Sequence, residues 1–328
     1  MLKTHIGDCR RILPTIEGES VQSCVTSPPY FGLRNYGESD QIGLEATVEE
    51  YVETMVEVFR EVKRILKDDG TLWLNLGDTY LSNPSNNQVP QTKDHKGSGH
   101  NGSNRKPQLG LKPKDLIGIP WRVAFALQAD GWYLRQDIIW NKPNPMPESV
   151  RDRCTKSHEY IFLLSKSPRY YFDQEGISEP CTYGHEAKYD NGMNGHHSAV
   201  SSQGNGNSTR KFKKSGNKER KTGQERGCPE GTGSNVWEGL TRNKRSVWTV
   251  STKPFNDAHF AVYPPELILP CILAGSKPGD TILDPFGGSG TTGKVAIENG
   301  RKAVLIELNP EYGKLIDQRT TTTVGLGI

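Results

Sequence analysis

An acceptor-rich proline loop lies near the start of the chain. Thr26-Ser27-Pro28-Pro29-Tyr30 follows residues 21–25, a short run with the character of a buried strand. The prolines remove two backbone donors and fix φ at both positions, and each keeps the residue before it out of the helical region. The loop therefore offers two free backbone carbonyls, the Ser27 hydroxyl and the flat ring of Tyr30. These groups suit a planar ring with an exocyclic amine, because oxygens accept the amine hydrogens while the aromatic ring stacks.

A glycine loop late in the chain carries the second chemical signal. Asp284-Pro285-Phe286-Gly287-Gly288-Ser289-Gly290-Thr291 follows an expected strand at 281–283 and leads into an expected helix from Thr291 that stops at Gly300. The next expected strand, 303–306, ends at Glu307. The glycines let the backbone approach a ligand closely, and an acid at the tip of the following strand suits ribose hydroxyls. This order predicts a nucleoside-type cofactor site.

Two cofactors, NAD(P) and S-adenosylmethionine, would both suit this site. Only 35 residues follow Gly293, which is too few for a second half of a dinucleotide-binding sheet. The remaining strands must therefore come from the N-terminal part, so the catalytic loop precedes the cofactor loop. By itself, this permuted order does not exclude NAD(P). Together with the Pro-Pro-Tyr loop, it favours S-adenosylmethionine and methyl transfer.

The two loops resemble the catalytic and cofactor motifs of the exocyclic-amino DNA methyltransferases, and their order is that of the β group of this family. The resemblance implies an α/β fold, a circularly permuted Rossmann-like domain with a mostly parallel sheet and an inserted target-recognition region. It assigns catalysis to Ser27, Pro28, Pro29 and Tyr30. It assigns S-adenosyl-L-methionine binding to Asp8, Asp284, Phe286, Gly288, Ser289, Gly290, Thr291, Glu307 and Phe260.

The resemblance also gives individual roles, some of which compete with simpler ones. Asp8 matches an acid that contacts the cofactor adenine, and Glu307 matches the acid that binds the ribose. Asp8 is equally placed to cap a short helix at 9–13. Trp140, in the segment 137–144, is a candidate to stack on a flipped base, or a core residue. Asn75 and Asp78 follow an expected strand, where polar groups line a site or simply form a turn.

Charge and composition indicate a nucleic-acid partner. The net charge is +3, but residues 81–114 hold six Lys/Arg against one acid, and residues 181–250 hold twelve against six. Both segments are rich in Gly, Asn and Ser, which predicts long solvated loops. Placed beside the Pro-Pro-Tyr loop, they would gather phosphates of double-stranded DNA. The resemblance also allows for a cognate restriction endonuclease acting on the same site.

The expected organisation is a catalytic half at 1–174 with a basic loop at 81–114, a target-recognition insertion at 175–248, and a cofactor half at 249–328. Helices are expected at 48–66, 120–129 and 265–274, and further strands at 71–76, 133–140 and 159–165. The chain has no apolar run long enough for a bilayer and no zinc-ligand spacing, so neither a membrane nor a metal is expected. Six scattered cysteines suit a reducing cytoplasm.

The resemblance implies that the target is the N4 amine of cytosine in duplex DNA, because in that family Ser before Pro-Pro-Tyr is typical of N4-cytosine enzymes. A base inside a duplex must be flipped out to be reached. N6-adenine methylation is the alternative. Further alternatives are methylation of RNA or of protein glutamine, and a nucleic-acid-binding protein without catalytic activity. Carbon-5 methylation would need a cysteine nucleophile, and neither Cys181 nor Cys271 occupies a suitable loop.

Overall fold

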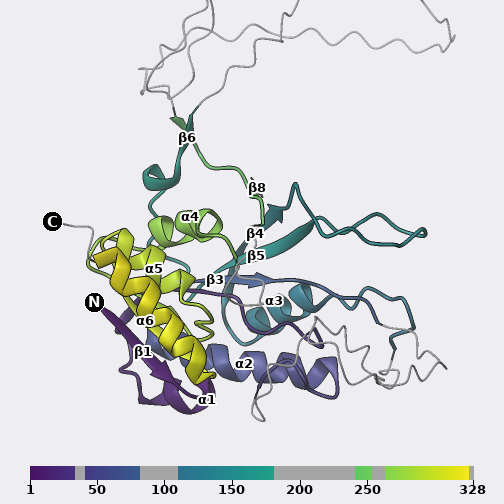
Figure 1. Ribbon diagram of the computed structural model, residues 1–328, viewed down its shortest axis with the longest axis horizontal. Coiled ribbons are helices and arrows are strands. Elements are labelled where there is room, and N and C mark those ends of the chain that lie inside the picture. Colours follow the sequence, from purple (N-terminus) through teal and green to yellow (C-terminus); the bar gives the residue numbers. More distant parts are fainter. Residues whose placement is uncertain (34–40, 82–109, 181–240, 253–262, 325–328) are drawn as a thin grey trace, which may run out of the picture. The chain divides into compact units, whose positions relative to one another are not determined.

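The computed structural model describes residues 1–33, 41–81, 110–180, 241–252 and 263–324 (Figure 1). The chain divides into two units, one of residues 1–179 with 243–328 and one of residues 180–242. Only Pro180, Thr241 and Arg242 of the second unit are described. Most of the expected basic loop, most of the expected recognition insertion and Phe260 therefore lie outside the described residues.

An eight-stranded sheet forms the centre of the first unit. Its order is β1-β10-β9-β2-β3-β5-β4-β8. The bounds are β1 (Leu2–Ile6), β2 (Val21–Thr26), β3 (Leu66–Leu76), β4 (Tyr133–Asn141), β5 (His158–Ser165), β8 (Val247–Thr249), β9 (Thr281–Asp284) and β10 (Lys302–Glu307). Among the described pairings only those of β5, with β3 and β4, are antiparallel; the other five are parallel. The sheet is therefore mostly parallel, as expected.

The permuted chain order is visible in the middle of this sheet. β2, from the N-terminal part, pairs directly with β9, from the C-terminal part, through Ser23↔Ile282 and Cys24↔Leu283. The strand order reverses at this junction, and ligands of open α/β sheets bind outside the carboxyl ends of the strands at such a point. The two loops singled out in the sequence are the loops that leave these two strands.

Helices cover both faces of the sheet (Figure 1). They are α1 (Cys9–Ile12), α2 (Val48–Ile65), α3 (Ile119–Ala129), α4 (Pro265–Gly275), α5 (Thr291–Glu298) and α6 (Pro310–Val324), with 3-10 turns η1 (Leu13–Thr15) and η2 (Glu175–Ile177). Two further short strands, β6 (Glu179–Pro180) and β7 (Thr241–Arg242), make a separate two-stranded sheet. One buried cluster joins α1, α2 and α3 to the sheet, and another joins α4 and α5 to it.

Side-chain alternation on β3 shows how the sheet serves both layers. Leu72 and Leu74 belong to the cluster under α2 and α3, whereas Trp73 between them belongs to the cluster under α4. Successive side chains of a strand point to opposite faces, and a parallel sheet covered on both faces needs apolar residues at nearly every position. This explains the continuous apolar run.

The structure contains the helix and the strand that were expected between residues 48 and 76, but the boundary between them differs, because Leu66 belongs to the strand. The 48–66 helix is present as α2, whose N-terminus is closed by a capping box between Thr47 and Glu50. The strand expected at 71–76 is longer, because Leu66 already pairs with Val21. The Leu66 carbonyl also accepts a 2.8 Å hydrogen bond from Lys166 Nζ, which helps keep this stretch extended.

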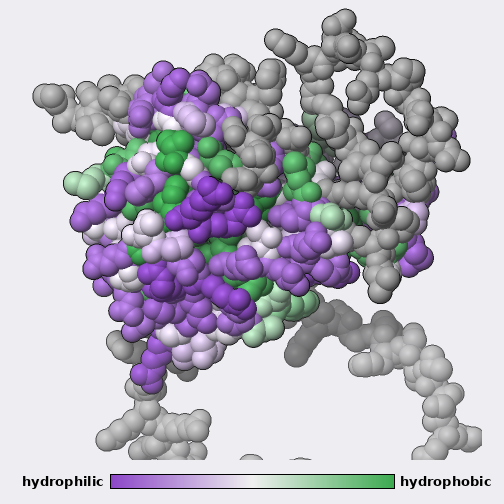
Figure 2. All heavy atoms as spheres, turned by 90° about the horizontal axis from the view of Figure 1, so that it is seen from below, coloured by the Kyte–Doolittle hydropathy of each residue, from purple (hydrophilic) through white to green (hydrophobic). Residues whose placement is uncertain are grey.

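The surface in Figure 2 is mostly hydrophilic over the described residues, with small separate hydrophobic areas. Large exposed apolar side chains such as Met146 and Phe125 come from different elements. Within the described residues, no helix combines the length and apolar character that crossing a membrane requires.

Candidate active site

The Pro-Pro-Tyr loop leaves the carboxyl end of β2, as its sequence predicts. Tyr51 of α2 donates a 2.9 Å hydrogen bond to the Pro29 carbonyl. The expectation of two free carbonyls is therefore wrong for Pro29, whose carbonyl anchors the loop to α2. No hydrogen bond among the described residues reaches the Pro28 carbonyl, which leaves it available as an acceptor.

Tyr30 is held in place by its ring and by its hydroxyl. A Cβ on Gly77 would lie 2.5 Å from Cε2 of the Tyr30 ring, so the ring packs on a position that only glycine allows. The hydroxyl lies 2.8 Å from Glu159 Oε2 and 3.1 Å from Asn75 Oδ1. Burial, and then the negative charge of Glu159, raise the pKa of Tyr30 well above its usual value.

The cluster around Tyr30 includes two charged residues that the sequence did not single out for a role. Glu159 is the second residue of β5, and Lys142 follows β4. Their side chains form an ion pair and are 15% and 18% exposed. Asn75 Nδ2 donates to the Tyr160 carbonyl at 3.0 Å and to Glu159 Oε2 at 3.3 Å. An acid at the start of an otherwise apolar strand is the one sequence signal that could have found Glu159.

Asn75 and Asp78, which the sequence left open between site and turn, have different roles. Asn75 belongs to the cluster around Tyr30. Asp78 instead accepts hydrogen bonds from the backbone N–H groups of Gly118 at 3.0 Å and Ile119 at 3.1 Å, at the start of α3. Asp78 therefore closes a helix N-terminus.

Asp284 joins the catalytic loop to the glycine loop. Its carboxyl group, 1% exposed, accepts hydrogen bonds from Thr26 Oγ1 at 2.6 Å and Thr292 Oγ1 at 2.6 Å. Tyr263 Oη at 3.1 Å and the Phe286 N–H at 3.0 Å complete the set. Burial raises the pKa of Asp284, and these hydrogen bonds oppose the rise. All four donors belong to the protein, so the carboxyl group fixes the relative position of the two loops.

The glycine loop has the backbone of a close-approach site. Gly288 and Gly290 have φ of +50° and +81°, a region that favours glycine. A Cβ on Gly293 would lie 2.7 Å from Leu305 Cδ1, so this glycine lets α5 pack closely on β10. The hydroxyl of Thr291 is buried and has no hydrogen-bond partner among the described residues. A buried unpaired polar atom at a helix N-terminus fits a loop that completes its hydrogen bonds with a ligand.

Arg319 of α6 supports this loop and was not found from the sequence. Its guanidinium donates to the Ser289 carbonyl at 2.7 Å and to Ser289 Oγ at 2.6 Å. Ser289 itself is buried. A lone arginine near the end of a chain gives no sequence signal of such a contact, because nothing local pairs it with the loop.

Asp8 and Glu307 lie at the ends of adjacent strands. Ile6 pairs with Glu307, and the Gly7 N–H donates to the Glu307 carbonyl at 2.8 Å. Asp8 caps α1 by accepting from the Arg10 N–H at 2.9 Å, which confirms the expected helix cap. Burial raises the pKa of Asp8, but hydrogen bonds from Arg10 and its charge outweigh burial, so the net pKa lies below the usual value.

The Glu307 carboxyl group faces the glycine loop. It accepts from the Gly288 N–H at 2.7 Å and the Asn309 N–H at 2.9 Å. Burial raises the pKa of Glu307 to about 7, although these two hydrogen bonds act against the rise. The group therefore titrates near neutral pH in the folded protein.

Glu307 is expected to make stability fall as pH rises from about 4.5 to about 7. In that window the folded protein keeps a proton that the unfolded chain has released, so each increase in pH favours unfolding. Glu307→Gln should remove this pH dependence, which amounts to a decrease in the free energy of unfolding on the order of 3 kcal/mol over the window. Urea unfolding of both proteins at pH 5 and pH 8 measures the difference, and equal changes in the two proteins would contradict the expectation.

Trp140 is placed by the structure in the core. It is 4% exposed, and its indole N–H donates to the Val250 carbonyl at 2.8 Å. Lys142 Nζ lies 4.2 Å from the centre of its ring. Trp140 therefore offers no open face for stacking on a base, and of its two expected roles the core role describes its position.

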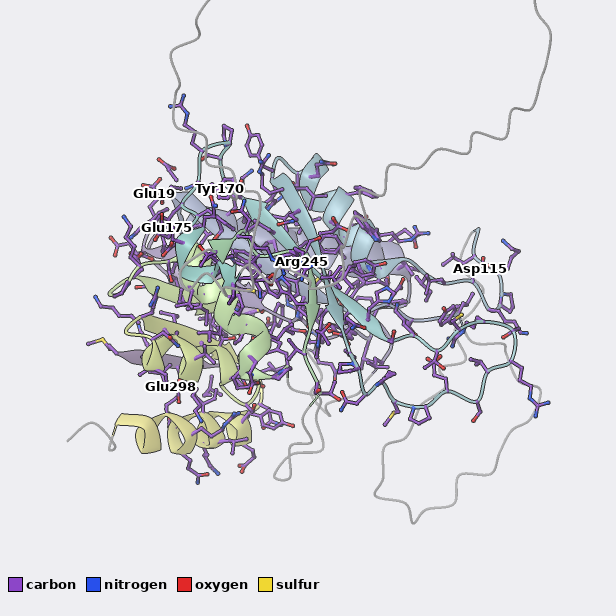
Figure 3. All side chains as sticks on the ribbon, turned by 90° about the horizontal axis from the view of Figure 1, so that it is seen from above. Glu19, Asp115, Tyr170, Glu175, Arg245 and Glu298 are labelled. Carbon is purple, nitrogen blue, oxygen red and sulfur yellow. The ribbon has the colours of Figure 1, made fainter. Side chains whose placement is uncertain are left out.

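The connection 142–157 between β4 and β5 leaves the same edge of the sheet as the two loops, because β4 runs in the same direction as β3 and β2. Lys114 Nζ pairs with Asp152 at 2.8 Å and joins this connection to the segment before α3, on which Asp115 is labelled in Figure 3. Among the described residues no group of three or more His, Cys, Asp or Glu could hold a metal ion.

Comparison with known proteins agrees with this geometry. A family model described as DNA methylase, N6_N4_Mtase, matches residues 21–318. The chain is 46% identical to the Type II methyltransferase M.SmaI of Serratia marcescens over 97% of this chain and 90% of that protein. It is 45% identical to M.XycI of Xanthomonas campestris pv. cyanopsidis over 95% of this chain and 85% of that protein.

Solved structures share the fold at lower identity. One is the PvuII DNA methyltransferase (cytosine-N4-specific), with a TM-score of 0.60, 18% identity and coverage of 99% of this chain and 90% of that chain. Another is TTHA0409 of Thermus thermophilus, a putative DNA modification methylase complexed with S-adenosyl-L-methionine, with a TM-score of 0.57, 21% identity and coverage of 100% and 98%. They confirm the expected fold class, and the sequence match confirms the expected family: the chain belongs to the N6/N4 DNA methylases.

Proposed function

We propose that this DNA methylase is a site-specific enzyme that transfers a methyl group from S-adenosyl-L-methionine to the exocyclic N4 amine of a cytosine flipped out of duplex DNA. The observation that carries the proposal is the 2.6 Å hydrogen bond from Thr26 to Asp284. It holds Ser27, the next residue of the chain, beside the glycine loop. An amine bound at Ser27 would thus lie next to a methyl donor bound at the loop, and positioning of this kind is the main source of rate in a direct transfer.

The residues at the strand ends fit the cofactor. Glu307 would accept from the ribose hydroxyls, and Asp8, one strand further, would lie near the adenine. Phe286, Gly288, Ser289, Gly290 and Thr291 would surround the amino-acid part, and Phe260 the methionine moiety. Bound there, S-adenosylmethionine supplies an electrophilic methyl group on a sulfonium sulfur.

The catalytic loop would orient the amine. The Ser27 hydroxyl oxygen and the Pro28 carbonyl accept its two hydrogens, which turns the nitrogen lone pair toward the methyl group. The Tyr30 ring stacks on the base. No covalent enzyme intermediate is needed, and the buried thiols agree with this: burial raises the pKa of Cys9 to about 12 and that of Cys24 well above its usual value.

Cytosine is favoured over adenine by Ser27 ahead of Pro-Pro-Tyr and by a structural relative whose title specifies cytosine N4. N6-adenine methylation on the same fold is the second candidate, since the matching family includes both chemistries in its name. We further propose that residues 175–248 read the target sequence and that residues 81–114 add phosphate contacts. The relatives are named Type II methyltransferases, which favours a restriction endonuclease partner and a cytoplasmic location with the cell's DNA.

Mass spectrometry of nucleosides tests the proposal. Plasmid DNA incubated with the protein and S-adenosylmethionine is expected to contain N4-methylcytosine, and protein with Ser27→Ala serves as the inactive control. N6-methyladenine in its place would keep the cofactor and mechanism but reject cytosine. The absence of any methylated base from DNA, together with methylation of RNA, would overturn the DNA assignment.

A further inference from the structure

A chain of hydrogen bonds leads from Ser27 away from the glycine loop. Ser27 Oγ donates to the Tyr30 hydroxyl at 3.4 Å, and the Tyr30 hydroxyl donates to Glu159 Oε2 at 2.8 Å. The other oxygen of Glu159 is paired with Lys142. The contact of Ser27 with Tyr30 is long, as catalytic hydrogen bonds often are before the substrate binds.

The direction of these hydrogen bonds is set by the donors available. The Tyr30 hydroxyl has one proton, and Glu159 Oε2 lies closer to it than Asn75 Oδ1 does. The Asn75 amide donates to the same Glu159 oxygen, so this oxygen accepts the hydrogen bonds of both Asn75 and Tyr30. Every proton in the chain therefore already points from Ser27 toward Glu159.

The charges around Glu159 suit a carboxylate at the end of such a chain. Lys142 balances the charge that a largely buried anion would otherwise leave unpaired. The charge of this carboxylate also acts on Lys156 and His158: the pKa of each is lowered, first by burial, and is raised in part by Glu159. Glu159 is still 15% exposed, which leaves a path for a proton to reach solvent.

Methylation of an amine produces a proton that must leave. The amine nitrogen bonds to the methyl carbon with its lone pair, the carbon–sulfur bond breaks with its electrons left on sulfur, and the nitrogen becomes cationic. It returns to neutrality only when an N–H proton is lost. Of the two oxygens that would accept the amine hydrogens, Ser27 Oγ can pass a proton on, because it carries a hydrogen of its own and the Pro28 carbonyl does not.

We propose that Glu159 is the final acceptor of the amine proton, which reaches it through Ser27 and Tyr30. The amine gives a proton to Ser27 Oγ, Ser27 gives its own to the Tyr30 oxygen, and Tyr30 gives its own to Glu159 Oε2. The products are a neutral methylated amine, unchanged Ser27 and Tyr30, and a protonated Glu159 that returns its proton to solvent. This inference rests on the proposed function, because it requires an amine bound at Ser27.

The experiment compares Glu159→Gln, Tyr30→Phe and the double variant in single-turnover methylation of plasmid DNA that the wild-type protein methylates. Each single variant is expected to lower the rate constant by about 10²-fold, the scale of proton-transfer catalysis. The double variant should be no slower than the slower single, because the two residues act in series. Affinity for S-adenosylmethionine should stay within about twofold, since neither residue touches the glycine loop.

Glu148→Gln is the matched control. Glu148 is also a partly buried acid in an ion pair, with Arg153 in the β4–β5 connection, but it is not part of the chain from Ser27. This variant should methylate at the wild-type rate. A loss equal to that of Glu159→Gln would show an effect of breaking ion pairs in this region and would overturn the proposal.

A second readout needs neither cofactor nor DNA. Glu159→Gln removes a negative charge that raises the pKa of Tyr30, so ultraviolet titration should show one tyrosine ionising at lower pH, and the signal should be missing in the double variant.

The outcomes separate the relay from the proposed function. Wild-type protein that methylates no base would reject the proposed function itself. Active wild-type protein with Glu159→Gln or Tyr30→Phe within about threefold of its rate would reject the relay alone. A rate loss in the double variant equal to the product of the two single losses would also reject the relay. If Glu159→Gln does not fold, the rate of Tyr30→Phe alone tests the relay.

Discussion

Replacing Ser27 with alanine is expected to lower the single-turnover rate of DNA methylation by about 10²- to 10³-fold, the usual cost of losing a group that orients or stabilises the reacting atoms. The Ser27 hydroxyl would contribute twice, by holding an amine hydrogen and by receiving the proton. Its one hydrogen bond among the described residues is the 3.4 Å contact with Tyr30. Losing so long a contact should change the free energy of unfolding by less than about 1 kcal/mol.

The measurement separates chemistry from binding. Rate constants come from quenched reactions with excess enzyme, and the affinity for S-adenosylmethionine comes from calorimetry. Ser20→Ala is the control, because Ser20 precedes β2 at the opposite end of the strand and bonds only the Glu17 carbonyl, at 2.6 Å, among the described residues. A wild-type rate in Ser27→Ala would contradict the orienting role of Ser27. A loss of cofactor affinity would instead show that Ser27 contributes to cofactor binding.

Gly290→Val is expected to weaken S-adenosylmethionine binding by at least about 100-fold, because a misplaced loop loses several contacts at once. Gly290 has φ of +81°, which a β-branched residue rarely adopts. A Cβ there would also lie 3.0 Å from Cγ1 of Ile316 in α6. The loop or α6 must move, and either movement disturbs the contact of Arg319 with Ser289. Backbone strain and overpacking should each lower stability by about 1–3 kcal/mol.

Gly279→Val is the matched control for this variant. Gly279 has a similar φ of +89°, but nothing lies within 4 Å of a Cβ placed there. It comes before β9, at the edge of the sheet opposite the cofactor loop. The control should therefore lose stability from strain and keep its cofactor affinity. Calorimetric titration with S-adenosylmethionine checks both proteins after circular dichroism shows that they are folded; unchanged affinity in Gly290→Val would mean that the loop does not bind the cofactor.

Local chemistry allowed much of the fold to be predicted from the sequence. The glycine loop between two short apolar runs predicted β9, α5 and β10, because glycine, capping and strand propensities act over a few residues. The apolar stripe of 48–66 predicted α2 for the same reason. The start of β3 was misplaced because Leu66 is kept extended by pairing with Val21 and by Lys166, which are distant in the sequence.

The candidate site was predictable mainly where its residues are adjacent in sequence. Ser27 through Tyr30 and Asp284 through Thr291 are each continuous, so their motifs could be read. The role of Trp140 could not be predicted, because an aromatic residue at the end of an apolar strand can stack on a base or belong to the core. Its burial and its hydrogen bond to Val250 place it in the core.

By itself the sequence determined the family, the permuted order of catalytic and cofactor loops, and the residue types that each loop presents. Only the tertiary structure decided which distant side chains complete them. Thr26 and Asp284 are 258 positions apart, and Tyr30 and Glu159 are 129 apart. Such pairs meet because β2 lies between β9 and β3, and β5 lies beside β3. The physical reason is that strand pairing brings the ends of distant segments to one edge of the sheet, and local propensities carry no record of it.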